Sequence, residues 1–260
     1  MTIPRSVTPR QWGTLLLTTV ALSHATGLPA QTTSPATTAT ANTEGGEGGE
    51  GGEGGAAQVT TDAQTDLNTL AKVDGYLRAG VEAYRQGQAG EAASLVAEAH
   101  EKLSGDLSAA DGPDLTTPIE GLSKAITDAA PQADVDAAYA SAQTAIANAM
   151  AHDTGNAKGQ LTAVYELLNA AAEEYEDSVT DGEIVDPIAW EEAHGFTLAA
   201  ADIARRLADG GASPAAETAL AAIQPAVEAF VYVDATRQML DDALLPATAA
   251  QVEFAALTVK

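Results

Sequence analysis

Glutamate and histidine side chains at helical spacing are the residues of this chain most suited to holding a metal ion. Glu191 and His194 stand three residues apart, which places both on one face of a helix. An imidazole nitrogen combined with carboxylate oxygens suits iron, copper or zinc. A complete site needs a further ligand from another helix, and the candidates are Glu173, Glu174 and Glu192. The spacing therefore predicts a site for iron or another divalent metal on this helix.

His100 occupies the matching position in an earlier copy of the same pattern. Glu98-Ala99-His100 resembles Glu192-Ala193-His194, but the earlier copy has Ala97 where Glu191 would match. The pair of ligands is therefore not repeated. The candidate metal ligands are Glu191, His194, Glu173 and His100. In the alternative interpretation these are half-exposed residues beside an apolar helix face, and they bind no metal.

Motifs that would indicate an enzyme are missing. The chain has no Gly-x-Ser-x-Gly turn, no phosphate-binding Gly-rich loop between strand and helix, and no His-Glu-x-x-His pair. Carboxylates occur throughout, so two of them close in sequence carry no information about acid–base catalysis. We therefore expect a protein that is not an enzyme and has no catalytic residues.

The composition is strongly acidic and lacks cysteine. Acidic residues outnumber basic ones by 37 to 12, which gives a net charge of −25 and a pI near 4.1. We expect no nucleic-acid partner, since phosphate binding needs clustered Lys and Arg. The acidity indicates either adaptation to high salt (a halophilic protein), where carboxylates keep the surface hydrated, or cation binding. Disulfides and thiolate metal sites are excluded because there is no cysteine.

Residues 1–30 have the features of a secretory signal peptide. Two arginines precede a short apolar run, Gly13 to Leu22, and Leu28-Pro29-Ala30 offers a small-residue cleavage site before Gln31. The run is shorter than the roughly 20 apolar residues that span a membrane. The mature chain is therefore expected to have no transmembrane segment and to be extracytoplasmic, either secreted or at the cell surface. An uncleaved membrane anchor is the alternative.

Residues 31–60 have the composition of a disordered linker. Thr, Ser, Ala and Pro dominate its first part, and Glu-Gly-Gly repeats run from Glu44 to Gly55. Glycine increases the conformational entropy of the chain and the spaced glutamates repel one another. We expect this segment to act as a tether.

The first half of the remaining chain, residues 61–152, has the apolar periodicity of amphipathic helices. Helices are expected from about Asp62 to Gln86 and from about Gly90 onward. Thr117-Pro118-Ile119-Glu120 has the spacing of a capping box with proline at the first helical position, which predicts a third helix. Pro131 separates this helix from a long alanine-rich one.

The second half, residues 157–258, repeats the pattern, and Leu168 to Tyr175 resembles Leu77 to Tyr84. Asp186-Pro187 and Ser213-Pro214 are N-cap signals for two further helices, and Pro225 is expected to kink the second of these. A last helical segment is expected to hold Met239, Leu240 and Leu244, with Pro246 as an interruption. The predicted fold is all-α, an antiparallel helical bundle built from two related helical halves.

The order of motifs in both halves is the strongest family signal. A Tyr-bearing helix is followed by an acidic turn, Asp181 to Val185, then by an aromatic-Glu-Glu helix start, Trp190 to Glu192, and by Phe196. The first half has Tyr84-Arg85-Gln86-Gly87 before an Ala-rich helix. Over roughly residues 62–230 the chain resembles the helical extracytoplasmic domain associated with microbial high-affinity iron permeases, in a salt-adapted, secreted or surface form.

The resemblance implies an accessory binding or docking module for iron uptake, whose partner is a membrane permease or a cell-surface protein. It does not imply transport by this chain alone, because the Arg-Glu-x-x-Glu motif of the permeases is missing and Arg205-Arg206 is not followed by glutamates. The alternative is a structural or protein-interaction module of the cell surface with no metal role.

Overall fold

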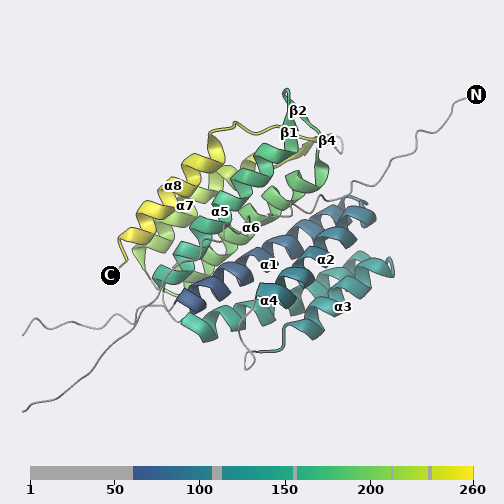
Figure 1. The fold of residues 1–260 in the computed structure, drawn as a ribbon, viewed down its shortest axis with the longest axis horizontal. Coiled ribbons are helices and arrows are strands. Elements are labelled where there is room, and N and C mark those ends of the chain that lie inside the picture. The colour runs from purple at the N-terminus through teal and green to yellow at the C-terminus, as the bar shows by residue number, and fades with distance from the viewer. Residues whose placement is uncertain (1–60, 107–112, 155–156, 212, 234–235, 260) are drawn as a thin grey trace, which may run out of the picture. The chain divides into compact units, whose positions relative to one another are not determined.

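Helices make up most of the described chain, and two short β-hairpins join helices in its second half (Figure 1). The computed structural model describes residues 61–106, 113–154, 157–211, 213–233 and 236–259. The first four helices are α1 (Thr61–Arg85), α2 (Ala89–Asp106), α3 (Thr116–Thr127) and α4 (Gln132–Thr154). The later elements are α5 (Ala157–Ser178), β1 (Val179–Thr180), β2 (Glu183–Ile184), α6 (Pro187–Asp209), α7 (Pro214–Ala229), β3 (Tyr232–Val233), β4 (Thr236–Arg237) and α8 (Leu244–Leu257). The predicted signal peptide, 1–30, and linker, 31–60, lie outside the described residues.

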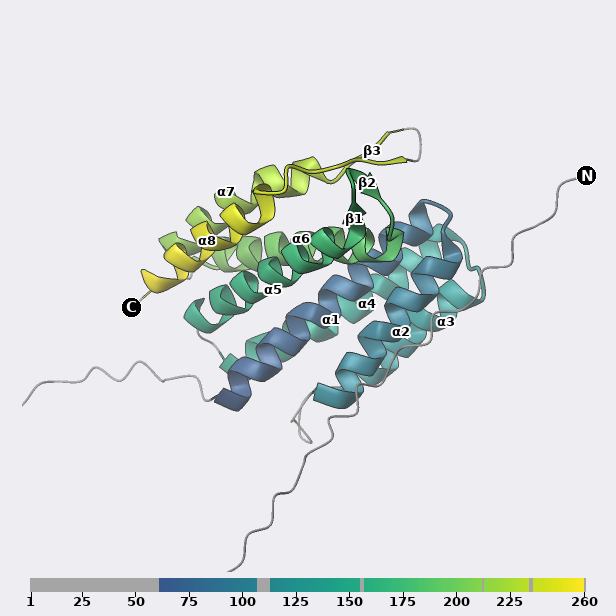
Figure 2. The same cartoon turned by 45° about the horizontal axis from the view of Figure 1, so that its top comes forward.

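Each half of the described chain closes into its own four-helix bundle. α1 packs on α2, α2 on α3, α3 on α4, and α4 packs back on α1. α5, α6, α7 and α8 form the same closed circuit. Figures 1 and 2 show the two bundles lying side by side. The all-α prediction is confirmed, and the helices form two bundles rather than one.

α1 joins the two bundles through a close crossing with α6, and it also packs against α5. A Cβ atom built on Gly195 would lie 2.3 Å from the carbonyl oxygen of Gly75 and 2.7 Å from the backbone nitrogen of Ala79. The two helix backbones therefore touch, and there is no room for a side chain at this point. Beside the glycines, the rings of Tyr76 and Phe196 pack edge to face at 5.0 Å.

Two of the three predicted helix caps form as expected. The Asp186 carboxylate accepts hydrogen bonds from the backbone nitrogens of Ile188 and Ala189, and the Ser213 hydroxyl accepts one from Ala215. The predicted capping box at Thr117 is wrong. There the carboxylate of Asp114 accepts the hydrogen bond from the backbone nitrogen of Thr117, at 3.1 Å. Asp114 thus takes the place that the Glu120 carboxylate has in a capping box, and the helix begins one residue early, at Thr116.

The predicted last helical segment is also wrong in its first part. Met239 and Leu240 precede α8, which begins at Leu244, and Pro246 lies in its first turn, where a missing backbone donor costs nothing. The buried hydroxyl of Tyr175 fixes the segment before the helix. It accepts a hydrogen bond from the backbone nitrogen of Leu240 at 2.7 Å and donates one to the carbonyl oxygen of Leu240 at 3.1 Å.

The acidic turn after α5 forms a hairpin that the periodicity did not predict. Val179 pairs with Ile184 and Thr180 with Glu183. Asp181 and Gly182 form the two-residue loop, with φ values of 53° and 77°. An Asp-Gly loop with both residues in this region is typical of a tight β-hairpin turn. The hairpin places α5 and α6 side by side.

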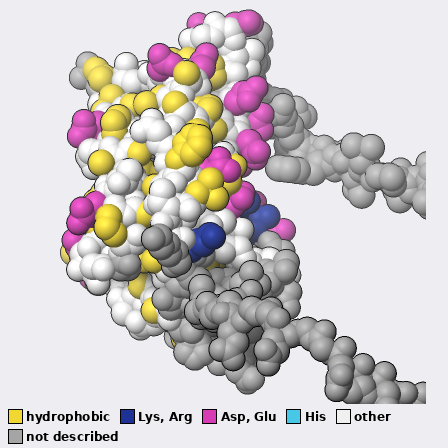
Figure 3. Space-filling view, turned by 90° about the vertical axis from the view of Figure 1, so that its left-hand side faces the viewer, with side chains coloured by type: hydrophobic (Ala, Val, Ile, Leu, Met, Phe, Trp, Pro, Cys, Tyr) yellow, Lys and Arg dark blue, Asp and Glu magenta, His cyan; other side chains and the backbone are white. Residues whose placement is uncertain are grey.

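None of the helices in the described ranges is long and apolar enough to cross a membrane. Their surface carries many carboxylates. On the face drawn in Figure 3, Asp and Glu side chains lie between hydrophobic ones, and Lys and Arg are sparse.

Candidate functional site

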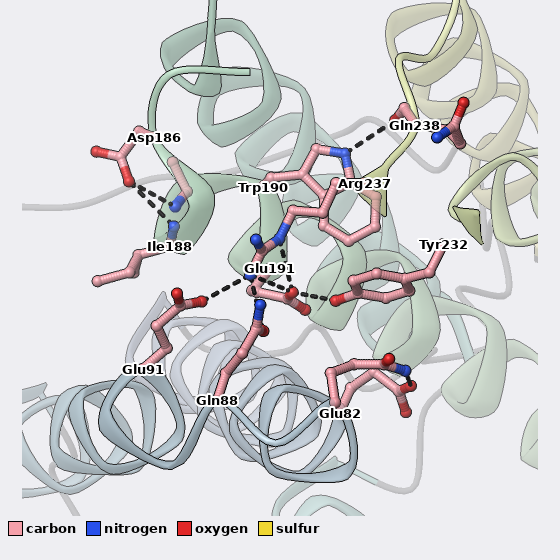
Figure 4. A network of polar contacts seen from close by, with 12 residues as sticks. Glu82, Gln88, Glu91, Asp186, Ile188, Trp190, Glu191, Tyr232, Arg237 and Gln238 are labelled. Atoms are coloured by element: carbon pink, nitrogen blue, oxygen red, sulfur yellow. Dashed lines mark hydrogen bonds and ion pairs between the residues drawn. The ribbon is translucent and has the colours of Figure 1, made fainter. Parts of the chain in front are cut away.

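The β3–β4 hairpin packs against the first turn of α6, and this contact builds the candidate site (Figure 4). The indole nitrogen of Trp190 donates a hydrogen bond to the carbonyl oxygen of Gln238 at 3.1 Å. The Trp190 ring packs edge to face on Tyr232 and on Phe230, each at 5.1 Å. Aromatic contacts of this kind bury much apolar area and fix ring geometry. The hairpin is thus held against the helix start.

Arg237 of β4 is the centre of a charge network that joins three segments of the chain. Its Nε donates a hydrogen bond to Glu191 Oε1 on α6 at 2.9 Å. Its Nη2 donates to Glu91 Oε2 on α2 at 2.6 Å and to Gln88 Oε1 in the α1–α2 turn at 2.8 Å. The hydroxyl of Tyr232 donates to the same Glu191 oxygen. One guanidinium therefore links the second bundle to the first.

Burial decides the electrostatics of this network. Glu191 is fully buried, and burial raises the pKa of its carboxyl group, while the hydrogen bond from Tyr232 and the charge of Arg237 lower it. A carboxylate at such a position is tolerated only when it is paired and hydrogen-bonded. Arg237 and Tyr232 supply both on Oε1, while Oε2 has no partner.

His194 lies one turn further along α6 and is almost fully buried. Its ring stacks on Phe230 at 5.0 Å and lies 5.4 Å from the Trp190 ring. Burial lowers the pKa of His194 to about 4, so the imidazole is neutral at pH 7. Its Nδ1 has no hydrogen-bond partner.

The four predicted metal ligands do not gather at one place. Glu191 and His194 are buried neighbours on α6, Glu173 is exposed on α5, and His100 lies on α2 beside α3, where it lines a shallow hollow with Glu120 and Lys124. Among the residues that the structure describes, no group of three or more His, Asp or Glu side chains could hold a metal ion. Arg237 and Tyr232 bind Oε1 of Glu191, so only Oε2 is left for a metal. The metal site stays a prediction. Its candidate ligand atoms are His194 Nδ1 and Glu191 Oε2, which have no hydrogen-bond partner.

A pair of carboxyl groups lies where α5 and α6 face each other. Glu174 of α5 and Glu192 of α6 are hydrogen-bonded, and the pKa of both is raised, first of all by burial. The pKa of Glu192 rises to about 8, because the charges of Glu174, Glu98 and Asp186 add to the effect of burial. Two carboxyl groups in contact share one proton, since both cannot ionise cheaply.

This pair predicts a stability that depends on pH. In the unfolded chain Glu192 loses its proton near pH 4.5, whereas in the fold it keeps the proton up to about pH 8. The contribution of the protonated Glu192 to the free energy of unfolding is therefore fully present below pH 4.5 and is lost as the pH rises through about 8. Glu192→Gln keeps a hydrogen-bond donor and removes the ionisation. We expect the variant to lose less stability than the wild type over this window and to be the more stable protein at its upper end.

Urea unfolding followed by circular dichroism at several pH values measures this difference. Asp209→Asn is the matched control, because it removes an exposed carboxylate from α6, the helix of Glu192, at its opposite end. Its curve is expected to run parallel to that of the wild type. Parallel curves for Glu192→Gln and the wild type would contradict the shared proton.

A second ion cluster lies on α1 and α6. Asp74 is buried and accepts a hydrogen bond from Arg78 Nε at 3.2 Å, and Arg78 Nη2 donates to Asp202 at 2.8 Å. Asp202 also pairs with Arg205 and Arg206. Burial raises the pKa of Asp74, which the arginines oppose. The alternating charges neutralise one another, so this cluster ties the bundles together.

Residues 151–237 match the family model of the iron permease-associated 4-helix bundle domain. The resemblance drawn from the sequence over roughly residues 62–230 is thereby confirmed for this part of the chain. The matched residues include α5, α6, α7 and both hairpins, and Arg237 is the last of them. No match was found among curated proteins or among solved structures.

The matched residues contain Glu191, its partners Tyr232 and Arg237, and His194. Glu91 and Gln88, the remaining partners, lie outside the matched residues. The match associates this part of the chain with iron uptake and is consistent with a membrane permease as partner. Sequence reasoning missed Arg237, although a signal existed: it is the only Lys or Arg between residues 207 and 259.

Proposed function

We propose that this chain is an accessory module of iron uptake that docks onto a membrane permease from the extracytoplasmic side. The observation that carries the proposal is the match of residues 151–237 to an iron permease-associated domain. The signal-like residues 1–30 and the tether-like residues 31–60 support the location. The Arg-Glu-x-x-Glu motif is missing from the chain, so its role is to assist rather than to transport.

Iron uptake by intact cells tests this function. We expect cells without the gene to take up less radioactive iron under iron limitation than the parent cells, and a plasmid-borne copy of the full chain to restore uptake. Manganese and zinc uptake, measured in the same cells, are the controls. Unchanged iron uptake would contradict the proposal and would favour a structural or protein-interaction module of the cell surface.

Metal binding by the chain itself is a second candidate function. It is favoured by one observation: Glu191 Oε2 and His194 Nδ1 are buried on neighbouring turns of α6, and neither has a hydrogen-bond partner. A neutral imidazole and a carboxylate are ligands for iron, copper or zinc. These two ligands do not complete a metal site. Water or a further side chain, such as Glu173 or His100 after a movement of the helices, would also have to bind the ion.

Isothermal titration of the chelator-treated chain with ferrous, ferric, cupric and zinc ions tests this second function. We expect one site per chain, lost in His194→Ala and in Glu191→Gln. Glu176→Gln, which removes an exposed carboxylate from α5, is the control and should leave the site intact. Binding no stronger than that of bulk carboxylates would exclude a metal role for this helix and leave docking as the function.

A further inference from the structure

Exposed apolar side chains gather at one end of the second bundle. In the described ranges seven large hydrophobic residues are exposed, and five of them belong to the hairpins or to residues next to them. These five are Val185, Ile188, Val231, Val233 and Met239, with exposed fractions between 36% and 56%. We call them the hairpin patch. The other two, Phe254 and Leu257, lie on α8 near the opposite end of the bundle (Figures 1 and 2).

The backbone that carries the hairpin patch is held in place from behind. Val185 donates its backbone hydrogen bond to the carbonyl oxygen of Ser178 at 2.8 Å, which anchors the residue after β2. On the other hairpin, Trp190 binds the backbone of Gln238, and Arg237 is tied to Glu191. Apolar side chains on an anchored backbone cannot turn inward, so they stay exposed. Exposed apolar patches on a soluble domain mark interaction sites more often than scattered single residues do.

Acidic residues flank the hairpin patch along the chain. The segment from 176 to 189 contains Glu176, Asp177, Asp181, Glu183 and Asp186 and has no Lys or Arg. Asp241 and Asp242 follow the second hairpin and are exposed. Arg237 is the basic residue of the second hairpin, and its charge is neutralised by Glu191 and Glu91. The patch therefore combines an apolar centre with a negative rim.

The charge of the rim selects among the possible occupants. A second copy of this chain would bring two negative rims together, and an anionic membrane surface would be repelled in the same way. A protein segment with apolar side chains between lysines or arginines matches both features. We infer that the hairpin patch is the surface that docks such a segment of the permease. This inference rests on the function proposed above and names the contact surface.

Site-specific photocrosslinking in the cells that make the protein tests the inference. A benzoylphenylalanine side chain is placed at Val233 or Val185 of the full chain. We expect a light-dependent adduct with the permease, mapped by mass spectrometry to a segment where apolar residues adjoin Lys or Arg. Adding Glu183→Lys should lower the yield at least about fivefold, because charge complementarity on the rim speeds the encounter. The matched control places the probe at Phe254 or Leu257, which are exposed but distant, and no permease adduct is expected there.

Several outcomes overturn the inference. They are equal permease adducts at the α8 positions, an adduct with a second copy or with lipid in place of the permease, and no adduct at either hairpin position. Iron uptake in the same strains separates the two proposals. If loss of the gene lowers uptake but the hairpin positions give no permease adduct, the docking surface is wrong and the proposed function stands. If uptake is unchanged, the proposed function is wrong whatever the adducts show.

Discussion

Arg237→Met is expected to lower the free energy of unfolding by about 3–5 kcal/mol, since it leaves a buried carboxylate without its counter-charge. Glu191 is fully buried, and among the residues that the structure describes Arg237 is the only cation that forms an ion pair with it. Methionine fills a similar volume, so the loss reports charge rather than a cavity. Urea unfolding followed by circular dichroism measures the change at pH 7.

A double variant separates charge from packing. Glu191→Gln combined with Arg237→Met removes both charges, and we expect it to recover a large part of the lost stability. Arg205→Met is the matched control, because Arg205 forms an exposed ion pair with Asp202 at 3.0 Å, and such pairs contribute about 0–1 kcal/mol. If Arg237→Met costs no more than Arg205→Met, the charge network is not what holds the hairpin to the bundles.

Gly195→Ala is expected to destabilise the protein by about 1–3 kcal/mol or more, although alanine is normally the better helix former by about 1 kcal/mol. The added Cβ would lie 2.3 Å from the carbonyl oxygen of Gly75, and a backbone atom cannot move aside as a flexible side chain can. α1 and α6 must separate, which disturbs the packing of Tyr76 on Phe196. Thermal and urea unfolding measure the loss.

Gly121→Ala is the control for this substitution. Gly121 lies inside α3, and a Cβ at that position meets nothing within 4 Å. We expect this variant to be as stable as the wild type or more stable by up to about 1 kcal/mol. If Gly195→Ala also stabilises the protein, the two helices do not approach as closely as the structure indicates.

Local signals in the sequence were enough to predict most of the helices. Asp186-Pro187 and Ser213-Pro214 combine a side-chain acceptor with a proline that needs no donor, and both start helices. The same reasoning failed at Thr117, because Asp114 rather than Glu120 accepts the hydrogen bond from the backbone nitrogen of Thr117. It failed again at Leu240, whose conformation depends on Tyr175, 65 residues earlier. Contacts between distant segments leave no local pattern.

The candidate site shows the same limit more strongly. The i, i+3 spacing correctly put Glu191 and His194 on neighbouring turns of one helix, but it could not say what lies opposite them. Arg237 arrives from a hairpin with strands of two residues, too short to show an alternating pattern. Because Arg237 pairs with Glu191, this carboxylate anchors a charge network, a role that the spacing did not indicate.

The matched residues end at Arg237, while the second bundle is closed by α8, which packs on α5 and α7 and buries Leu245 and Val252. A recombinant piece trimmed to the family limits would present bare alanine and leucine ridges to water. The shortest self-contained piece of this half must run on through Leu257.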